Sequence, residues 1–144
     1  YIVIGGRLDT FQAAFLLAKL PHYAKDIANR QSVAKAYTQA LADTVNTPQI
    51  MDDRTSVWAQ YTVKVENREQ LQENLKKAGI PTAVHYPMPL HLQECFQYLG
   101  YREGKFPVAE LLSKEVMSVP MNPLVTKEEI ELIVKRIKTF KEEK

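Results

Sequence analysis

A proline-rich segment, PTAVHYPMPLHLQ at residues 81–93, most strongly limits how this chain can fold. Proline fixes its own φ angle and favours an extended conformation in the residue before it. The segment therefore cannot enter a helix before about Leu90, and we expect a stiff, extended loop. Such a loop holds His85 and Tyr86 in a fixed direction at little entropic cost, which suits a binding site better than a flexible connector does.

The first 43 residues predict two consecutive helices. Asp9 followed three residues later by Gln12 is a helix-start pattern, and the alanine- and leucine-rich residues 11–20 continue the helix. Pro21 ends it and suits the first turn of a second helix, which should run to about Asp43. One apolar face with a period of about 3.6 residues marks the second helix. Its members are Tyr23, Ile27, Ala34, Tyr37 and Leu41.

The middle of the chain predicts a strand, a helix and a second, shorter strand. Strict alternation over residues 57–65 indicates a half-buried strand. Asn67 with Gln70 opens a helix that Gly79 closes. Residues 82–84 then form a short strand that leads into the proline-rich loop. The side chains expected to face inward are Val57, Ala59, Tyr61, Val63 and Val65 in the strand and Leu71, Leu75 and Ala78 in the helix.

The last third of the chain predicts a helix at about residues 108–116, a short strand near residues 117–120 and a final helix. Thr126 and Glu129 form a capping-box pattern at the start of that final helix. Its apolar stripe consists of Ile130, Ile133, Val134, Ile137 and Phe140. Short strands separated by helices predict a small sheet covered by helices, an α+β arrangement.

Composition excludes several classes of protein. A net charge of +2, with both signs spread along the 144 residues, argues against a nucleic-acid surface. The longest apolar stretch, residues 13–18, is too short to cross a bilayer. A single cysteine, Cys95, makes no internal disulfide and indicates a reducing, cytoplasmic location. The chain opens without an initiator methionine or a signal peptide, which suggests a piece of a longer protein.

The residue types alone suggest two kinds of reactive site, a metal site and a nucleophilic cysteine. His91 and Cys95 would share a face of a helix starting near Leu90 and could join His85 as metal ligands. The chain offers no fourth ligand nearby, so we favour a helix surface or a packed cysteine and expect no metal. Cys95 could also act as a nucleophile with a histidine as its base, but a position in mid-helix disfavours this role.

Two further features have both a structural and a functional interpretation. The segment IGGRLD at residues 4–9 lacks a phosphate-binding glycine pattern. The preferred interpretation is a flexible entry into the first helix. Alternatively, its glycines let a ligand approach the backbone while Arg7 offers a bidentate fork to a carboxylate or phosphate. Aromatic side chains at Tyr98, Tyr101 and Phe106 either form a stacking surface or fasten a loop to the core.

Four blocks of sequence, in order, resemble one family. They are GGRLDTFQAAFLLAKL, HYPMPLHLQECFQYLGY, GKFPVAE and SVPMNPLVTKEEIELIVKRI. They resemble the C-terminal part of the DegT/StrS family of pyridoxal-phosphate-dependent sugar aminotransferases, with patterns such as N-x-R-L-D, H-Y-P-x-P-L-H-L-Q and F-P-x-A-E. The resemblance extends from about Gly5 to Lys138.

The resemblance implies the small C-terminal domain of a fold-type-I aminotransferase, with a small, mostly antiparallel sheet covered by helices. Residues 1–43 would form a helical lead-in and a long linking helix, and residues 57–144 the sheet layer. A cofactor domain upstream would be absent from this chain. The full-length homodimer would transfer an amino group from glutamate to a nucleotide-linked keto-sugar for surface polysaccharides or antibiotics. We expect neither nucleic acid nor membrane as a partner.

The resemblance also assigns roles to residues. Arg7 matches the family's arginine that approaches the substrate in the partner subunit, and it suits a diphosphate or a sugar carboxylate. His85 and Tyr86 match the pair on the loop that faces the sugar, and His91 matches a second histidine, for which we favour a structural role. Gly5 replaces the family's asparagine that reaches the cofactor phosphate, so only its backbone N–H could serve there.

The lysine that bonds the cofactor covalently lies upstream in the family, in a serine-rich segment, and no lysine here has that context. The resemblance therefore implies no catalytic residue in this chain, and we predict that it is inactive alone. A family minority with histidine in place of lysine dehydrates sugars, and these residues are equally compatible with that reaction. The alternative from another class is a non-catalytic binding or interaction module that reuses the fold.

Overall fold

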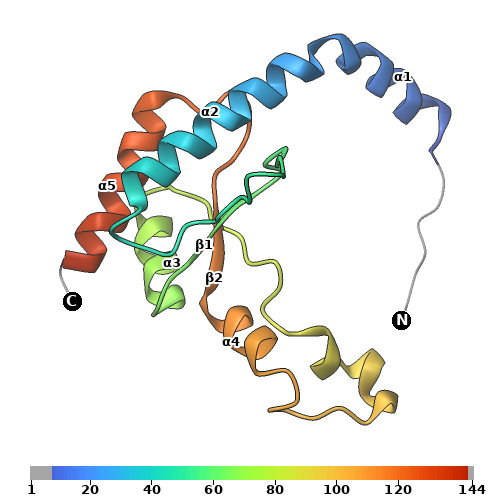
Figure 1. The fold of residues 1–144 in the computed structure, drawn as a ribbon, viewed down its shortest axis with the longest axis vertical. Helices are drawn as coiled ribbons and strands as arrows, with labels where there is room; N and C mark the ends of the chain where they lie inside the picture. The colour runs from blue at the N-terminus through green and yellow to red at the C-terminus, as the bar shows by residue number, and fades with distance from the viewer. Residues whose placement is uncertain (1–7, 143–144) are drawn as a thin grey trace.

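The computed structural model describes residues 8–142, in which helices pack against a two-stranded antiparallel sheet (Figure 1). Strand β1 (Tyr61–Lys64) pairs with β2 (Val116–Val119), and Tyr61 lies opposite Val119. The β-branched and aromatic residues of both strands favour this pairing because they pack well on a pleated surface. The predicted α+β class with an antiparallel sheet is confirmed.

The first predicted strand is shorter than the alternation suggested. Trp58 has a φ angle of 51°, which interrupts the extended backbone three residues before β1. Its indole N–H donates to Gln31 Oε1 at 2.9 Å, and its ring packs on Tyr61 with centroids 5.5 Å apart. Burial of Trp58 leaves Val57 half-exposed, the reverse of the predicted faces. The predicted strand at residues 82–84 is also wrong, because only a single bridge joins Ala83 to Ser118.

The two N-terminal helices form one long arm (Figure 1). Helix α1 (Thr10–Lys19) begins at the predicted capping box, where Gln12 N–H donates to Asp9 Oδ1 at 2.8 Å. A 3-10 turn, η1 (Leu20–His22), connects it to α2 (Tyr23–Leu41). The C-terminal half of α2 packs on the core as predicted, through Ala34, Tyr37 and Leu41. The predicted face is wrong at Tyr23, which is half-exposed, and α1 buries no side chain at all.

The core lies between the sheet and three helices. Helix α5 (Lys127–Glu142) contacts both α2 and α3 (Arg68–Lys77). The predicted inward side chains of α3 and α5 are buried, apart from the half-buried Ala78. The largest fully buried side chains are Tyr37, Tyr61, Leu41, Leu71, Leu75, Met117, Ile137 and Val63. Gly79 ends α3 with a φ of 74°, a conformation that favours glycine.

The remaining elements lie at the far end of the molecule from α2 and α5 (Figure 1). Two 3-10 turns, η2 (Leu90–Leu92) and η3 (Glu94–Leu99), follow the proline-rich segment. Helix α4 (Pro107–Glu115) then leads directly into β2, close to the predicted bounds. Pro107 occupies the first turn of α4, where a missing N–H costs nothing. The proline-rich segment thus enters no helix before Leu90, as predicted.

Replacing Thr126 with alanine is expected to lower the free energy of unfolding by about 1 kcal/mol. The predicted capping box of α5 is present: Glu129 N–H donates to Thr126 Oγ1 at 3.2 Å, and Thr126 N–H donates to Glu129 Oε2 at 2.8 Å. Urea denaturation of the purified chain measures the change. Thr126→Ser keeps the hydroxyl and is the control. Equal losses in the two variants would show that the hydroxyl does not cap the helix.

Candidate functional site

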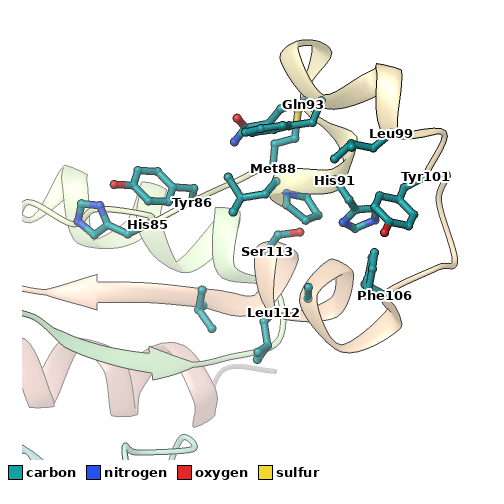
Figure 2. Close-up of a pocket in the computed structure, with 15 residues that line it drawn as sticks. His85, Tyr86, Met88, His91, Gln93, Leu99, Tyr101, Phe106, Leu112 and Ser113 are labelled. Atoms are coloured by element: carbon teal, nitrogen blue, oxygen red, sulfur yellow. The ribbon is translucent and has the colours of Figure 1, made fainter. Parts of the chain in front are cut away.

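His85 and Tyr86 lie side by side on the segment that leaves the edge of the sheet (Figure 2). Upstream, Ala83 and Ser118 exchange two backbone hydrogen bonds, with N···O distances of 3.1 Å and 2.7 Å. Both aromatic side chains are exposed, Tyr86 to 70%. Their rings meet edge to face with centroids 5.6 Å apart, and the peptide bond between the two residues is cis. The structure therefore presents an imidazole and a phenol together on the surface.

An open pocket of about 570 Å³ adjoins this pair. Figure 2 shows His85 and Tyr86 at one end of the pocket and Tyr101 and Phe106 at the other. Most of the wall between them is apolar, formed by Met88, Leu90, Phe96, Leu99, Leu112 and Val116. Within residues 8–142, no lysine, arginine, aspartate or glutamate lines it. The pocket thus suits an uncharged, partly apolar group, with polar contacts supplied mainly at its rim.

A buried carboxylate behind the pocket joins three segments of chain. Glu110 Oε1 lies 2.9 Å from His91 Nε2, and the Glu110 carboxylate accepts the backbone N–H groups of Gly104 at 2.8 Å and Phe106 at 3.2 Å. The Glu110 and His91 residues are each only 8% exposed. Their contacts connect η2, the loop before α4 and the first turn of α4.

These hydrogen bonds favour the ionised form of Glu110. The Gly104 N–H is the largest cause that lowers the pKa of Glu110, and the Phe106 N–H and His91 act in the same direction against the effect of burial. An ionised carboxylate only accepts hydrogen bonds, so His91 Nε2 carries the proton in this contact. The structural role expected for His91 agrees with this position.

Acid is expected to remove the contribution of Glu110 to stability. Because the folded-state pKa is lowered, that contribution is present above the unfolded value of about 4.3 and is lost as the pH falls through the folded value. Urea unfolding of wild type and Glu110→Gln between about pH 6 and pH 3 tests this. The difference in unfolding free energy should shrink as the pH falls. A difference that stays constant with pH would contradict an ionised Glu110 in this contact.

The predicted arrangement of His91 and Cys95 on one helix is wrong. Gln93 adopts an extended conformation, with φ −70° and ψ 142°, and separates two short 3-10 turns. His91 faces Glu110, whereas Cys95 is half-buried with Sγ 3.9 Å from Gln93 Oε1. Residues 8–142 contain no group of three or more potential metal ligands.

The aromatic residues that follow η3 divide into two groups. Tyr101 and Phe106 pack edge to face with centroids 5.2 Å apart, and Phe106 also packs on His91 at 4.9 Å. These two residues form the far wall of the pocket (Figure 2). Tyr98 is not among the residues that line the pocket and is 76% exposed. Tyr101 and Phe106 therefore fasten the loop, which was one of the two interpretations of the sequence. They also shape the pocket.

Two predicted site residues, Gly5 and Arg7, lie outside the described residues. Glu110 was missed as a site residue, although a local signal existed. An acidic side chain in the first turn of a helix that starts with Pro107 can reach back to the N-terminal N–H groups, and Glu110 does so at Phe106. Its contact with His91, 19 residues away, has no such local signal.

A model of the DegT/DnrJ/EryC1/StrS aminotransferase family matches residues 2–138. The chain belongs to this family. It is 44% identical over 138 residues to a "Pleiotropic regulatory protein" of Geobacillus stearothermophilus, covering 93% of this chain and 37% of that protein. It is also 44% identical over 131 residues to the UDP-2-acetamido-2-deoxy-3-oxo-D-glucuronate aminotransferase of Pseudomonas aeruginosa, covering 90% and 36% respectively.

The fold agrees with that of solved members of the family. A DegT/DnrJ/EryC1/StrS aminotransferase from Brucella abortus superposes with a TM-score of 0.88 at 37% identity, covering 94% of this chain and 36% of the other. The chain thus spans little more than a third of the length of the relatives it matches. None of the helices within residues 8–142 combines the length and apolar character needed to span a bilayer.

The described residues do not by themselves fit the pyridoxal phosphate that aminotransferases of this family use. The chemistry needs a lysine held at the cofactor, and a buried, desolvated amine is the usual device. Every lysine within residues 8–142 is exposed or half-buried, and none lines the pocket. The described residues therefore supply no covalent anchor for the cofactor.

Proposed function

We propose that this chain is the C-terminal small domain of a pyridoxal-phosphate-dependent aminotransferase that transfers an amino group from glutamate to a nucleotide-linked keto-sugar. One observation carries the proposal. This chain, which belongs to the family, presents His85 and Tyr86 next to each other and exposed at the rim of an uncharged pocket. Hydroxyl-rich sugars are bound through hydrogen bonds from such polar groups beside apolar walls. The protein would work in the cytoplasm.

The domain arrangement is part of the proposal. Residues 1–43 would be the helical lead-in and linking helix and residues 57–144 the sheet layer, with the cofactor bound mainly by a separate N-terminal domain. The surface of α1 supports this because it is largely apolar yet exposed, with Phe11 at 81%, Phe15 at 69% and Leu17 at 69%. Apolar surface of this extent usually marks a contact with another protein surface. The rest of the full-length homodimer would supply that contact.

Each proposed site residue has a role that fits its chemistry. His85 and Tyr86 would hydrogen-bond the sugar hydroxyls or a substrate acid group. Arg7 would bind a diphosphate or a sugar carboxylate across the dimer, because its planar guanidinium matches either group. The relative from Pseudomonas aeruginosa is named for a 3-oxo-glucuronate, which carries such a carboxylate. Gly5 would offer its backbone N–H to the cofactor phosphate.

The proposal is tested with the longer protein that it requires, encoded by the gene extended upstream of Tyr1. The purified protein is incubated with pyridoxal phosphate, glutamate and a panel of UDP- and dTDP-linked 3-keto and 4-keto sugars. The expected result is an amino-sugar nucleotide, detected by mass spectrometry, together with 2-oxoglutarate. The 144-residue chain alone, with the same additions, should form neither product. A longer protein that forms neither product with any sugar would contradict the proposal.

One observation favours the non-catalytic alternative. The relative from Geobacillus stearothermophilus is named a regulatory protein. A start codon close to Tyr1, with no reading frame for a larger domain before it, would favour an interaction module. Consumption of keto-sugar with water loss and no amine transfer would instead indicate the dehydratase reaction.

A further inference from the structure

The segment that carries His85 and Tyr86 is fixed at both of its ends. Upstream, the two backbone hydrogen bonds between Ala83 and Ser118 attach it to β2. Downstream, the next buried attachment is His91, whose Nε2 lies 2.9 Å from Glu110. The chain between these points contains two prolines and therefore has little freedom of its own. The direction of the exposed pair thus depends on both attachments.

We infer that Glu110 is a positioning residue for the nucleotide-sugar, acting through His91 on the segment that carries His85 and Tyr86. The inference rests on the proposed function, and it adds a residue that does not itself touch substrate. Glu110 is buried without lysine or arginine as an ion-pair partner in the part of the chain that the structure describes. Three N–H donors satisfy it instead, and such fixed donors hold a carboxylate in one place.

The same carboxylate also holds the opposite wall of the pocket. Its bonds to Gly104 and Phe106 fix the loop before α4, and Phe106 in turn packs on both His91 and Tyr101. Loss of the Glu110 carboxylate would therefore release both walls together. A substrate that must contact both walls would lose affinity, because binding would then include the cost of ordering them.

Glu110 and His91 lie outside the main hydrophobic core. The apolar side chains of the adjoining pocket, such as Leu90, Phe106 and Leu112, are not members of the cluster of buried apolar side chains between the sheet and α2, α3 and α5. Removing their contact should therefore loosen the pocket while the core stays folded. This separation makes a positioning role distinguishable from a general effect on stability.

The test uses four variants of the longer protein. Glu110→Ala removes the acceptor, and His91→Phe keeps an aromatic ring on Phe106 but removes the N–H donor. His91→Gln loses the ring and keeps an N–H that can reach Glu110. Glu103→Gln is the control, because Glu103 lies on the same loop with its side chain 75% exposed. KM and kcat are measured separately for the keto-sugar and the glutamate half-reactions, and thermal unfolding is recorded for each variant.

Glu110→Ala and His91→Phe are expected to raise KM for the keto-sugar about tenfold, the effect of one lost hydrogen bond on affinity. KM for glutamate and kcat of the glutamate half-reaction should stay unchanged, and His91→Gln should restore much of the affinity. Hydrogen exchange should show the Gly104 and Phe106 amides unprotected in Glu110→Ala but protected in Glu103→Gln. An unchanged KM for the sugar, or an equal loss of activity in both half-reactions, would overturn this inference and leave the proposed function standing. A wild-type protein that aminates no sugar would overturn the proposed function together with it.

Discussion

Replacing His85 with alanine in the full-length protein is expected to lower kcat/KM for the keto-sugar by roughly 10- to 100-fold. The imidazole is exposed at the rim of the pocket, so its removal would take away the proposed hydrogen bonds to the substrate and no buried contact. A hydrogen bond that involves a charged partner contributes about 1.5–3 kcal/mol, which corresponds to this range. The glutamate half-reaction should be unaffected, since the proposed function has glutamate and the sugar react in separate steps.

His22→Ala is the matched control for this prediction. His22 is also exposed, but it lies on the η1 turn of the N-terminal arm, away from the pocket. Stopped-flow measurement of each half-reaction compares wild type with the two variants. Equal impairment of both half-reactions by His85→Ala would indicate a structural role for His85 and would contradict the proposed sugar contact.

Truncation of Ile137 to alanine is expected to lower the free energy of unfolding by about 2–5 kcal/mol. Ile137 is fully buried at the centre of α5, which packs against both α2 and α3. Removing most of its side chain leaves a cavity that these helices, held by the sheet and by one another, only partly close. Urea denaturation of the 144-residue chain, followed by circular dichroism, measures the loss.

Ile137→Val serves as the graded control and should lose only about 0.5–1.5 kcal/mol. Leu132→Ala, on the half-exposed face of the same helix, should change stability less than Ile137→Ala. If Ile137→Ala lost no more stability than Leu132→Ala, α5 would not be packed against α2 and α3 in the way that the structure shows.

The elements that the sequence predicted well are those determined by local patterns. The apolar stripe of α5 follows the helical period, and Thr126 with Glu129 marks its start within four residues. Prolines similarly limited the segment around His85, because their effect on φ does not depend on distant contacts. Both the α+β class and the position of His85 and Tyr86 could therefore be predicted from local sequence patterns.

The errors arose where tertiary contacts override local patterns. Alternation continued through Trp58, but the indole turns inward to reach Gln31, 27 residues away, and shortens the strand. Helical spacing linked His91 to Cys95, yet the bond to Glu110 draws His91 in another direction. Both decisive partners lie far along the chain, so no window of local sequence contains them.

The N-terminal arm shows a third kind of error. The apolar period of α2 extends to Tyr23, and the residues of α1 are equally apolar, but within the described chain Tyr23 stays half-exposed and no side chain of α1 is buried. A sequence pattern indicates which face is apolar and not which molecule or domain buries it. The proposed remainder of the protein would provide that surface.

Borohydride reduction of the full-length protein in the presence of pyridoxal phosphate, followed by peptide mass mapping, tests the central claim most directly. Reduction fixes the cofactor permanently to the lysine that binds it. We predict a single modified lysine outside these 144 residues, which would leave this chain the role of presenting His85 and Tyr86 to the sugar. A specific adduct on a lysine of this chain, or no adduct anywhere in the protein, would contradict the account.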